Sequence, residues 1–438
     1  SKVLHSWPCG ARGAYCCVLS NPQCLDIGSL LGDPRQSPFA AALRSSTYLL
    51  VIPNNACSPY SRIWCVYEAF LAYSWDKAIY TASAPIRRRW AHPLGVCLAV
   101  AAGASVTVPA WAFAAPGDAL VAYRALIMAT VVSYASIFAP SSERAILMYY
   151  ICGGLAGVSA CFNIALVIRG YAPDSPMLAV MPPSAWVVYI FFGFASVAAC
   201  AYDWKRERQL CLESVHLRKE FTGSFHDAQA SEPMDRERIM ADIEASGNLK
   251  YVNQAVEVLL RAGMSTPSLR AATARGGDVR GAACWSLGHV LAILLSWVVI
   301  PLANVVLDDS CAGQWRFVPG LKAAEGLAWL VIFATKQLDQ RSFLTTTACK
   351  LAVVPYMLVF VLWISAALLL QLPMDHRNCV PDALSAFVLG PCMLALAVAG
   401  VAGTARLPVI GPHIITFALA WGRGTHPPPA ALEQVESV

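Results

Sequence analysis

The sequence predicts a mainly α-helical, polytopic membrane protein, with about eight spans in two blocks of four and a partial α/β segment at the N-terminus. Three observations predict this class. The 438-residue chain is 57% hydrophobic and only 13% charged, whereas soluble proteins carry about 25% charged residues. Its mean hydropathy is +0.53. Its apolar residues gather into runs close to the ~20 residues that a helix needs to cross a bilayer.

The apolar runs form two blocks, residues 86–202 and 283–421, on either side of a hydrated region at 203–282. The runs themselves lie at 93–115, 119–140, 144–168 and 178–202 in the first block, and at 284–307, 321–335, 347–372 and 382–405 in the second. The stretch 407–421 holds two prolines and fits a ninth span, a re-entrant segment or an interfacial helix, of which we favour the last. The Pro-rich tail 422–438 is expected to be disordered.

The distribution of Lys and Arg predicts the orientation of the chain. Segments on the N-terminal side of the bilayer are rich in Lys and Arg, and the loops on the other side carry mostly Asp. This positive-inside bias predicts that both termini and the central region are cytoplasmic. The net charge is only +5 and the one dense basic cluster is 87–89, so nucleic acid is not an expected partner. The expected partner is the lipid bilayer.

Sixteen cysteines are scattered along the chain, without the Cys/His spacing of a zinc site. Cys311 and Cys379 are the only two in predicted outer loops, where they form a disulfide if that side is oxidising, or stay as two unpaired thiols. Arg124, Asn304 and Glu325 are the polar candidates within the spans. Groups of this kind mark transport paths, although residues near span ends also reach the interface without any such role.

The N-terminal segment, residues 1–85, contains the elements of an α/β layer. Residues 37–46 predict a short amphipathic helix, and the continuous apolar run 47–53 predicts a strand buried on both faces, as in parallel sheets. Ser58 is expected to cap the next helix, which extends to about Trp75. Residues 78–82 fit a second short strand.

The central region, residues 203–282, predicts two helices. The first begins near Pro233 with Ser231 as its candidate N-cap, and the second covers about 250–262. The sequence that follows, SLRAATARGGDVRG, predicts a flexible lead into the next span.

Glu68 stands out in the N-terminal segment because it lies on an aromatic face. On a helix, Trp64, Glu68, Leu71 and Trp75 share one side. Burial raises the pKa of a carboxyl group, and ligands tend to bind at the carboxyl edge of a parallel sheet. Glu68 is therefore a candidate acid/base group. The alternative is a structural Glu, bonded to a backbone amide or to Arg62.

The stretch 46–72, with its strand TYLLVIP and the motif WC-x-x-E, resembles the later part of a Toll/interleukin-1 receptor (TIR) domain. The arrangement RIWCVYEAFLA also resembles TIR-like proteins of dinoflagellate algae, in which such segments precede several membrane spans. The resemblance implies that Glu68 is catalytic, as in TIR domains that cleave NAD, and that Trp64 and Cys65 pack. A first strand of the form DVFISY is not recognisable among residues 1–36.

With half of the TIR pattern, the sequence predicts a degenerate cytoplasmic module with membrane sensing, scaffolding or signalling as its function. Its partners would be other TIR-like proteins or a second copy of the chain. No cofactor is expected, and NAD would be a substrate only if a longer chain or a partner subunit completes the site. A TIR-type NAD hydrolase using Glu68 and a transporter or channel are the alternatives.

Overall fold

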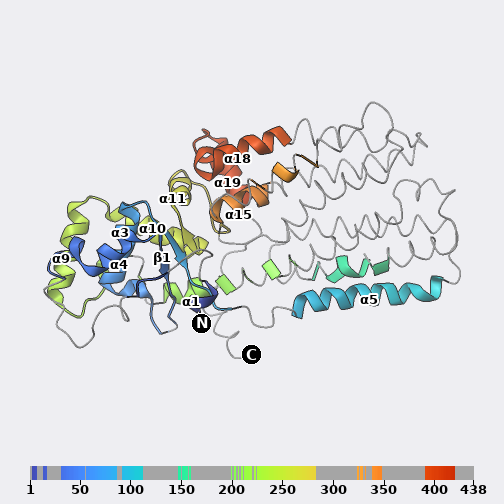
Figure 1. The fold of residues 1–438 in the computed structure, drawn as a ribbon, viewed down its shortest axis with the longest axis horizontal. Coiled ribbons are helices and arrows are strands. Elements are labelled where there is room, and N and C mark those ends of the chain that lie inside the picture. Colours follow the sequence, from blue (N-terminus) through green and yellow to red (C-terminus); the bar gives the residue numbers. More distant parts are fainter. Residues whose placement is uncertain are drawn as a thin grey trace.

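The computed structural model of the chain describes residues 2–6, 13–16, 31–54, 56–85, 91–111, 221–222, 224–282, 338–347 and 390–419, with shorter pieces within 147–158, 199–219 and 323–331. This part is mainly helical, as the sequence predicts. Figure 1 shows α3, α4, α9 and α10 around the strands at one end, while α5 runs away from them. Most predicted spans and the tail 422–438 lie largely or wholly outside the described residues.

The N-terminal elements confirm most of the local predictions. Their bounds are α1 (Lys2–His5), η2 (Pro34–Gln36), α3 (Pro38–Ser45), β1 (Tyr48–Val51), η3 (Pro59–Ser61), α4 (Ile63–Ser74) and β2 (Ala78–Thr81). The Ser37 hydroxyl accepts a hydrogen bond from the Ala40 amide and so caps α3. Ser58 instead caps η3, because its hydroxyl accepts from the Tyr60 amide and α4 starts only after Arg62.

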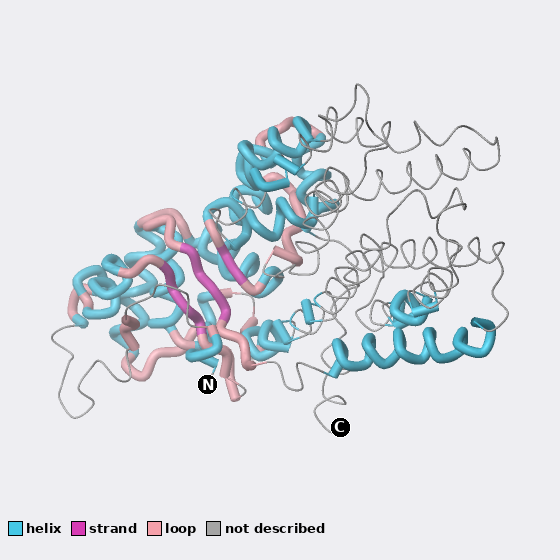
Figure 2. The backbone as a smooth tube through the Cα atoms, turned by 45° about the vertical axis from the view of Figure 1, so that its right-hand side comes forward, coloured by secondary structure: helices cyan, strands magenta, loops and turns pink. Residues whose placement is uncertain are grey.

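The sheet has three strands in the order β1-β2-β3, where β3 is Met264–Ser265 from the central region. Strand β1 is parallel to β2, with Leu49 opposite Ile79, and β3 is antiparallel to β2. The prediction that 47–53 is buried on both faces is wrong for most of the strand. Within β1 itself only Val51 is buried, because this strand lies at the edge of the described sheet. Figure 2 shows the strands in magenta between helices.

The central region confirms two predicted helices and adds a third. These are α9 (Pro233–Ala245), α10 (Leu249–Ala262) and α11 (Pro267–Ala274), with the short η5 (Phe225–Asp227) before them. Ser231 is not the N-cap of α9; Glu232 holds that position, without a side-chain cap. The prediction of a flexible segment is wrong for its first part, which forms α11. Thr266 caps this helix, and its own residues Leu269 and Ala272 are buried.

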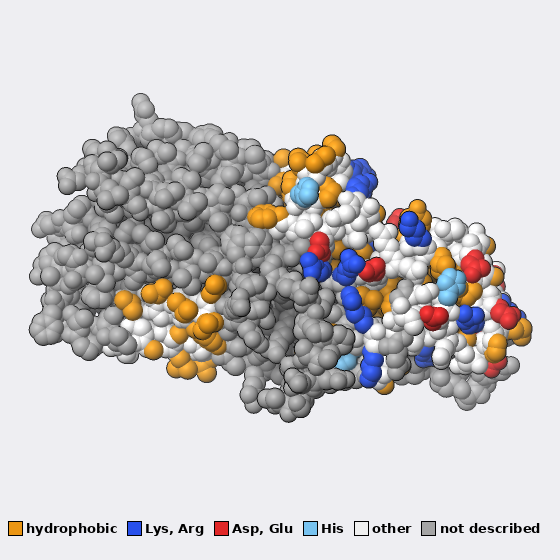
Figure 3. All heavy atoms as spheres, turned by 180° about the vertical axis from the view of Figure 1, so that it is seen from behind, with side chains coloured by type: hydrophobic (Ala, Val, Ile, Leu, Met, Phe, Trp, Pro, Cys, Tyr) orange, Lys and Arg blue, Asp and Glu red, His pale blue; other side chains and the backbone are white. Residues whose placement is uncertain are grey.

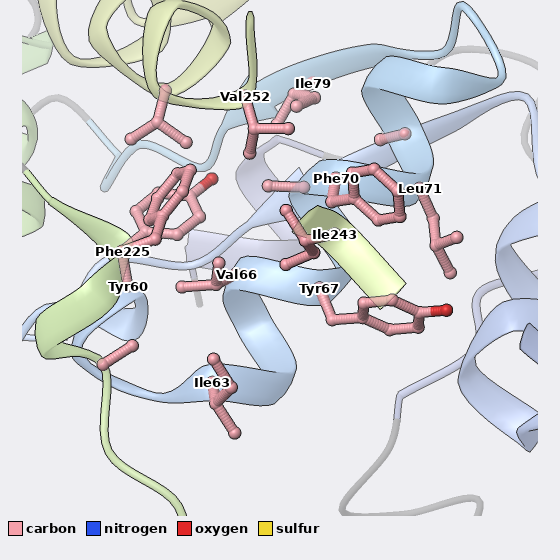
Figure 4. Close-up of a cluster of buried hydrophobic side chains, with 14 of the residues drawn as sticks. Tyr60, Ile63, Val66, Tyr67, Phe70, Leu71, Ile79, Phe225, Ile243 and Val252 are labelled. Atoms are coloured by element: carbon pink, nitrogen blue, oxygen red, sulfur yellow. The ribbon is translucent and has the colours of Figure 1, made fainter. Parts of the chain in front are cut away.

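One hydrophobic core joins the N-terminal and central segments, although residues 86–202 lie between them in sequence. Helix α4 is at its centre and packs on α3, α9 and α10. A helix that is apolar on nearly every side is expected to be covered in this way. Figure 4 shows the core, whose largest fully buried members include Tyr60, Ile63, Tyr67, Phe70, Leu71, Ile79, Leu217, Phe225 and Ile239. The N-terminal and central segments therefore form one folded module.

Helix α5 (Ala91–Trp111) packs closely on the helical turns within 147–158. A Cβ at Gly157 would clash with the carbonyl oxygen of Val100, and one at Gly103 would clash with that of Gly154. The small-residue stripe of Gly153, Gly154 and Gly157 is typical of helices that pack this closely.

The remaining described helices form a second layer, which packs on α11 around its own core. They are α15 (Leu338–Thr347), α18 (Gly390–Ala405) and α19 (Ile410–Leu419). Gly400 interrupts α18 with a φ of 63°, so the run 382–405 is not one continuous helix. No single described helix is long and apolar enough to cross a bilayer; the bent pair Ala395–Ala405 and Ile410–Leu419, at 108°, meets that test together.

Candidate functional site around Glu68

The motif residues Trp64, Cys65 and Glu68 lie on the first two turns of α4. The Trp64 ring packs on Phe39 of α3 at 5.0 Å between centroids, and its Nε1 donates a hydrogen bond to Asp235 Oδ2 at 3.1 Å. Cys65 is half-buried and is not in a disulfide. Trp64 therefore connects α4 to both α3 and α9, which is a packing role.

Glu68 is half-buried on α4, and its carboxyl group makes no hydrogen bond or ion pair within the described residues. Burial raises its pKa from 4.5 to about 7, and the positive charge of Arg62 offsets part of this rise. Among the described residues, Glu68 therefore makes neither the backbone hydrogen bond nor the ion pair with Arg62 that a structural role was expected to involve. A carboxyl group with a pKa near neutrality can both donate and accept a proton under physiological conditions.

Tyr60 adds a second polar group next to Glu68, and the sequence gives no motif that identifies it. The side chain is fully buried, and its hydroxyl has no hydrogen-bond partner within the described part of the chain. Burial raises the pKa of Tyr60 well above its ordinary value, and the nearby Cys65 and Glu68 raise it further. Figure 4 shows the Tyr60 ring beside Phe225 in the core. Tyr60, Cys65 and Glu68 therefore form one electrostatically coupled cluster.

A hydrogen-bond network on the other side of α4 holds the helix in place. The Tyr67 hydroxyl donates to Asp242 Oδ2 at 2.8 Å, and Arg35 Nε donates to Asp242 Oδ1, also at 2.8 Å. Burial, followed by the bond to Asp242, raises the pKa of Tyr67. This network connects η2, α4 and α9, and so it fixes the helix that carries Glu68.

A second buried polar group lies between α11 and the second helix layer. Asp339 of α15 is fully buried, and its Oδ2 accepts a hydrogen bond from the Thr266 hydroxyl at 2.7 Å. Burial raises the pKa of Asp339, and the bond from Thr266 partly lowers it. The nearby Arg270 donates to the Lys77 carbonyl and stacks over the Tyr73 ring at 5.1 Å. These contacts position α11 and α15, and no sequence motif predicts them.

The other predicted site residues lie outside the described residues: Arg124, Asn304, Glu325, Cys311 and Cys379. Within the described ranges, no group of three or more His, Cys, Asp or Glu side chains is arranged to hold a metal ion. The chemistry that the described part of the site can supply is proton transfer by Glu68, with the phenol of Tyr60 beside it.

Comparisons with protein-family models, with curated proteins and with solved structures found no match to this chain. The resemblance of residues 46–72 to a TIR domain therefore stays a prediction from the motif and its local structure.

Proposed function

We propose that the chain is a multi-pass membrane protein whose N-terminal and central segments fold into one signalling or scaffolding module on the cytoplasmic face. The module would respond to movements of the first membrane block, residues 86–202, because it is connected to both ends of that block. The module, which is organised around the TIR-like helix α4, would present an interaction surface to a second copy or to another TIR-like protein.

The observation that carries this proposal is the shared core of α4 with α9 and α10. Residues 31–85 precede the first block and residues 212–282 follow it, so any separation of the ends of that block would pull directly on the core. A packed core has few intermediate arrangements. A change in the spans would therefore be passed to the module as a discrete change in packing.

The surface of α5 supports the membrane location. Leu94 and Leu98 are exposed on this helix, and residues 94–111 contain no Asp, Glu, Lys or Arg. Large exposed apolar surfaces on one element are typical of protein or lipid contacts. The lower part of Figure 3 shows a patch of exposed hydrophobic side chains, well away from the charged module at the other end.

The shared core of the N-terminal and central segments can be tested by inserting a protease site after residue 85 of the full-length chain. After cleavage, the N-terminal piece should stay bound to membranes through the shared core. Phe70→Ala should release it, because deleting a buried Phe side chain costs about 3–5 kcal/mol. Met234→Ala is the matched control, because Met234 is exposed on α9. Release of the N-terminal piece from the wild-type chain would show that the shared core does not hold the two segments together.

The scaffolding role can be tested with two differently tagged full-length copies in mild detergent. The copies, or the chain and another TIR-like protein, should be isolated together, and Phe70→Ala should abolish this association while the spans remain in the membrane. If neither kind of partner is isolated with an intact module, the proposed scaffolding function is wrong.

NAD cleavage is the second candidate function, and the pKa of about 7 at Glu68 favours it. A group that shares its proton near neutral pH suits acid/base work or charge stabilisation at a glycosidic bond. The test is nicotinamide release from NAD by the full chain in lipid nanodiscs. Glu68→Gln should abolish release, whereas Glu244→Gln, a change on α9, should leave it unaltered. Absence of release from the wild-type chain would exclude this candidate.

A further inference from the structure

The connection between α18 and α19 forms an exposed apolar elbow, which we define as residues 406–410. All five residues, Arg406, Leu407, Pro408, Val409 and Ile410, are exposed. Val409 is 79% exposed and Ile410 is 57% exposed, and both are branched apolar side chains. Consecutive exposed apolar residues at the tip of a turn are unusual in water, because each one keeps apolar surface hydrated.

The elbow is held rigidly from its inner side. Gly411 lies against the carbonyl oxygen of Thr404 so closely that a Cβ would clash there. The Thr416 hydroxyl accepts a hydrogen bond from the Asp278 amide at 2.9 Å, and Ile415 is fully buried in the second core. Because one side of α19 is fixed in this way, the side chains of the elbow project away from the protein.

Val409 has a φ of 63°, which is unfavourable for a β-branched residue. The Ile410 amide donates to the Pro408 carbonyl at 2.7 Å, and the Gly411 amide donates to that of Leu407 at 3.1 Å. This strained, hydrogen-bonded turn produces the 108° bend between the helices and presents Val409 at its apex. Strained residues of this kind often mark functional sites.

Among the described residues of this helix layer, the exposed charged side chains are positive. Arg406 begins the elbow, and Arg275 is exposed at the end of α11, which packs on α18. The described acidic groups of the same layer are paired or buried: Asp278 pairs with Arg280 at 2.6 Å, and Asp339 is inside the protein. The upper edge of Figure 3 shows hydrophobic side chains next to blue ones over these helices. Apolar side chains next to exposed arginines complement the anionic surface of a bilayer.

We propose that the elbow inserts into the boundary between headgroups and acyl chains of an anionic bilayer. Leu407, Val409 and Ile410 enter the apolar boundary, Arg406 contacts the phosphates, and α19 lies along the membrane surface. This inference rests on the proposed membrane location and adds to it a defined lipid contact. It also accounts for the exposure of the strained turn, because lipid covers the side chains that water would otherwise hydrate.

A photo-crosslinking amino acid at position 409 of the full-length chain tests the contact in native membranes. The matched control carries the same amino acid at 234, which is also an exposed apolar position but lies on α9 of the module. We expect phospholipid adducts at 409 by mass spectrometry and none above background at 234. Protein adducts alone, or no adduct, at 409 would overturn the inference.

Nanodiscs of defined composition test the lipid class. We expect lipid adducts at 409 to be more abundant with phosphatidylserine than with phosphatidylcholine alone. The variant Arg406→Glu should remove this difference. Equal amounts of adduct in both lipids with the wild-type arginine would overturn the anionic preference. Alkaline extraction distinguishes a failure of the elbow contact from a failure of the proposed membrane location. If the chain stays in the membrane pellet but 409 captures no lipid, only the elbow is wrong. If the chain is extracted, the membrane proposal is wrong as well.

Discussion

The Tyr67 hydroxyl donates a hydrogen bond of 2.8 Å to Asp242, although 175 residues separate the two in sequence. This bond joins the segment that precedes residues 86–202 to the segment that follows them. Together with the core around Phe70, it makes the module depend on both segments at once.

We expect Tyr67→Phe to destabilise the module by about 1 kcal/mol, because the ring still fills its site while one hydrogen bond is lost. Tyr251→Phe is the matched control, since Tyr251 is exposed on α10 and stacks on Tyr73 through its ring. The measurement is the unfolding midpoint of the module, followed by protease resistance in the full-length chain. Equal midpoints for the two variants would show that the bond to Asp242 contributes nothing.

Glu68 should make the stability of the module depend on pH. In the unfolded chain its carboxyl group ionises near 4.5, whereas in the fold burial raises the pKa to about 7. The folded state therefore binds more protons between these values, and its contribution to stability is lost as the pH rises through this window. Glu68→Gln removes the titration. We expect the variant to gain stability relative to wild type from pH 4.5 to 7, with no further gain above.

Unfolding midpoints at a series of pH values check this, with Glu244→Gln on the exposed side of α9 as the control. A constant difference between Glu68→Gln and wild type across the window would contradict the raised pKa.

Thr266→Val should destabilise the junction between α11 and α15. The Thr266 hydroxyl donates to Asp339 and also accepts from the Leu269 amide at 3.3 Å as the cap of α11. Its removal leaves a buried carboxyl oxygen without this donor, which costs about 1–3 kcal/mol. Thr273→Val is the control, because the Thr273 hydroxyl is buried without a partner among the described residues. This change should be neutral or stabilising, and a loss as large as that of Thr266→Val would refute the role of the bond.

Gly157→Ala should separate α5 from the helical turns at 147–158. The added Cβ meets the carbonyl oxygen of Val100, which is backbone and cannot rotate away, so we expect a loss of about 1–3 kcal/mol from overpacking. At Gly154 the nearest atom to an added Cβ is the Ala99 oxygen at 3.8 Å, an ordinary contact. Gly154→Ala should therefore be tolerated. Thermal stability in detergent should distinguish the two, and equal effects would contradict the packing.

Local patterns in the sequence determined most of the individual elements. Ser37 before Pro38 marks the start of α3, and the apolar run before Pro53 becomes β1. Gly263, with a φ of 72°, ends α10 and allows the turn into β3. Such signals can be read from sequence because each one involves residues a few positions apart. The stripe of Gly153, Gly154 and Gly157 likewise indicated the close packing of helices.

Only the tertiary structure decided which segments share a core and which polar groups are buried. Asp242 and Tyr60 carry no motif, since their roles depend on partners brought near by the fold. The pKa of Glu68 likewise depends on the surrounding side chains and not on its place in WC-x-x-E. Burial and long-range contacts are properties of the packed chain, and a local pattern records only the residue's own preference for a helix or a strand.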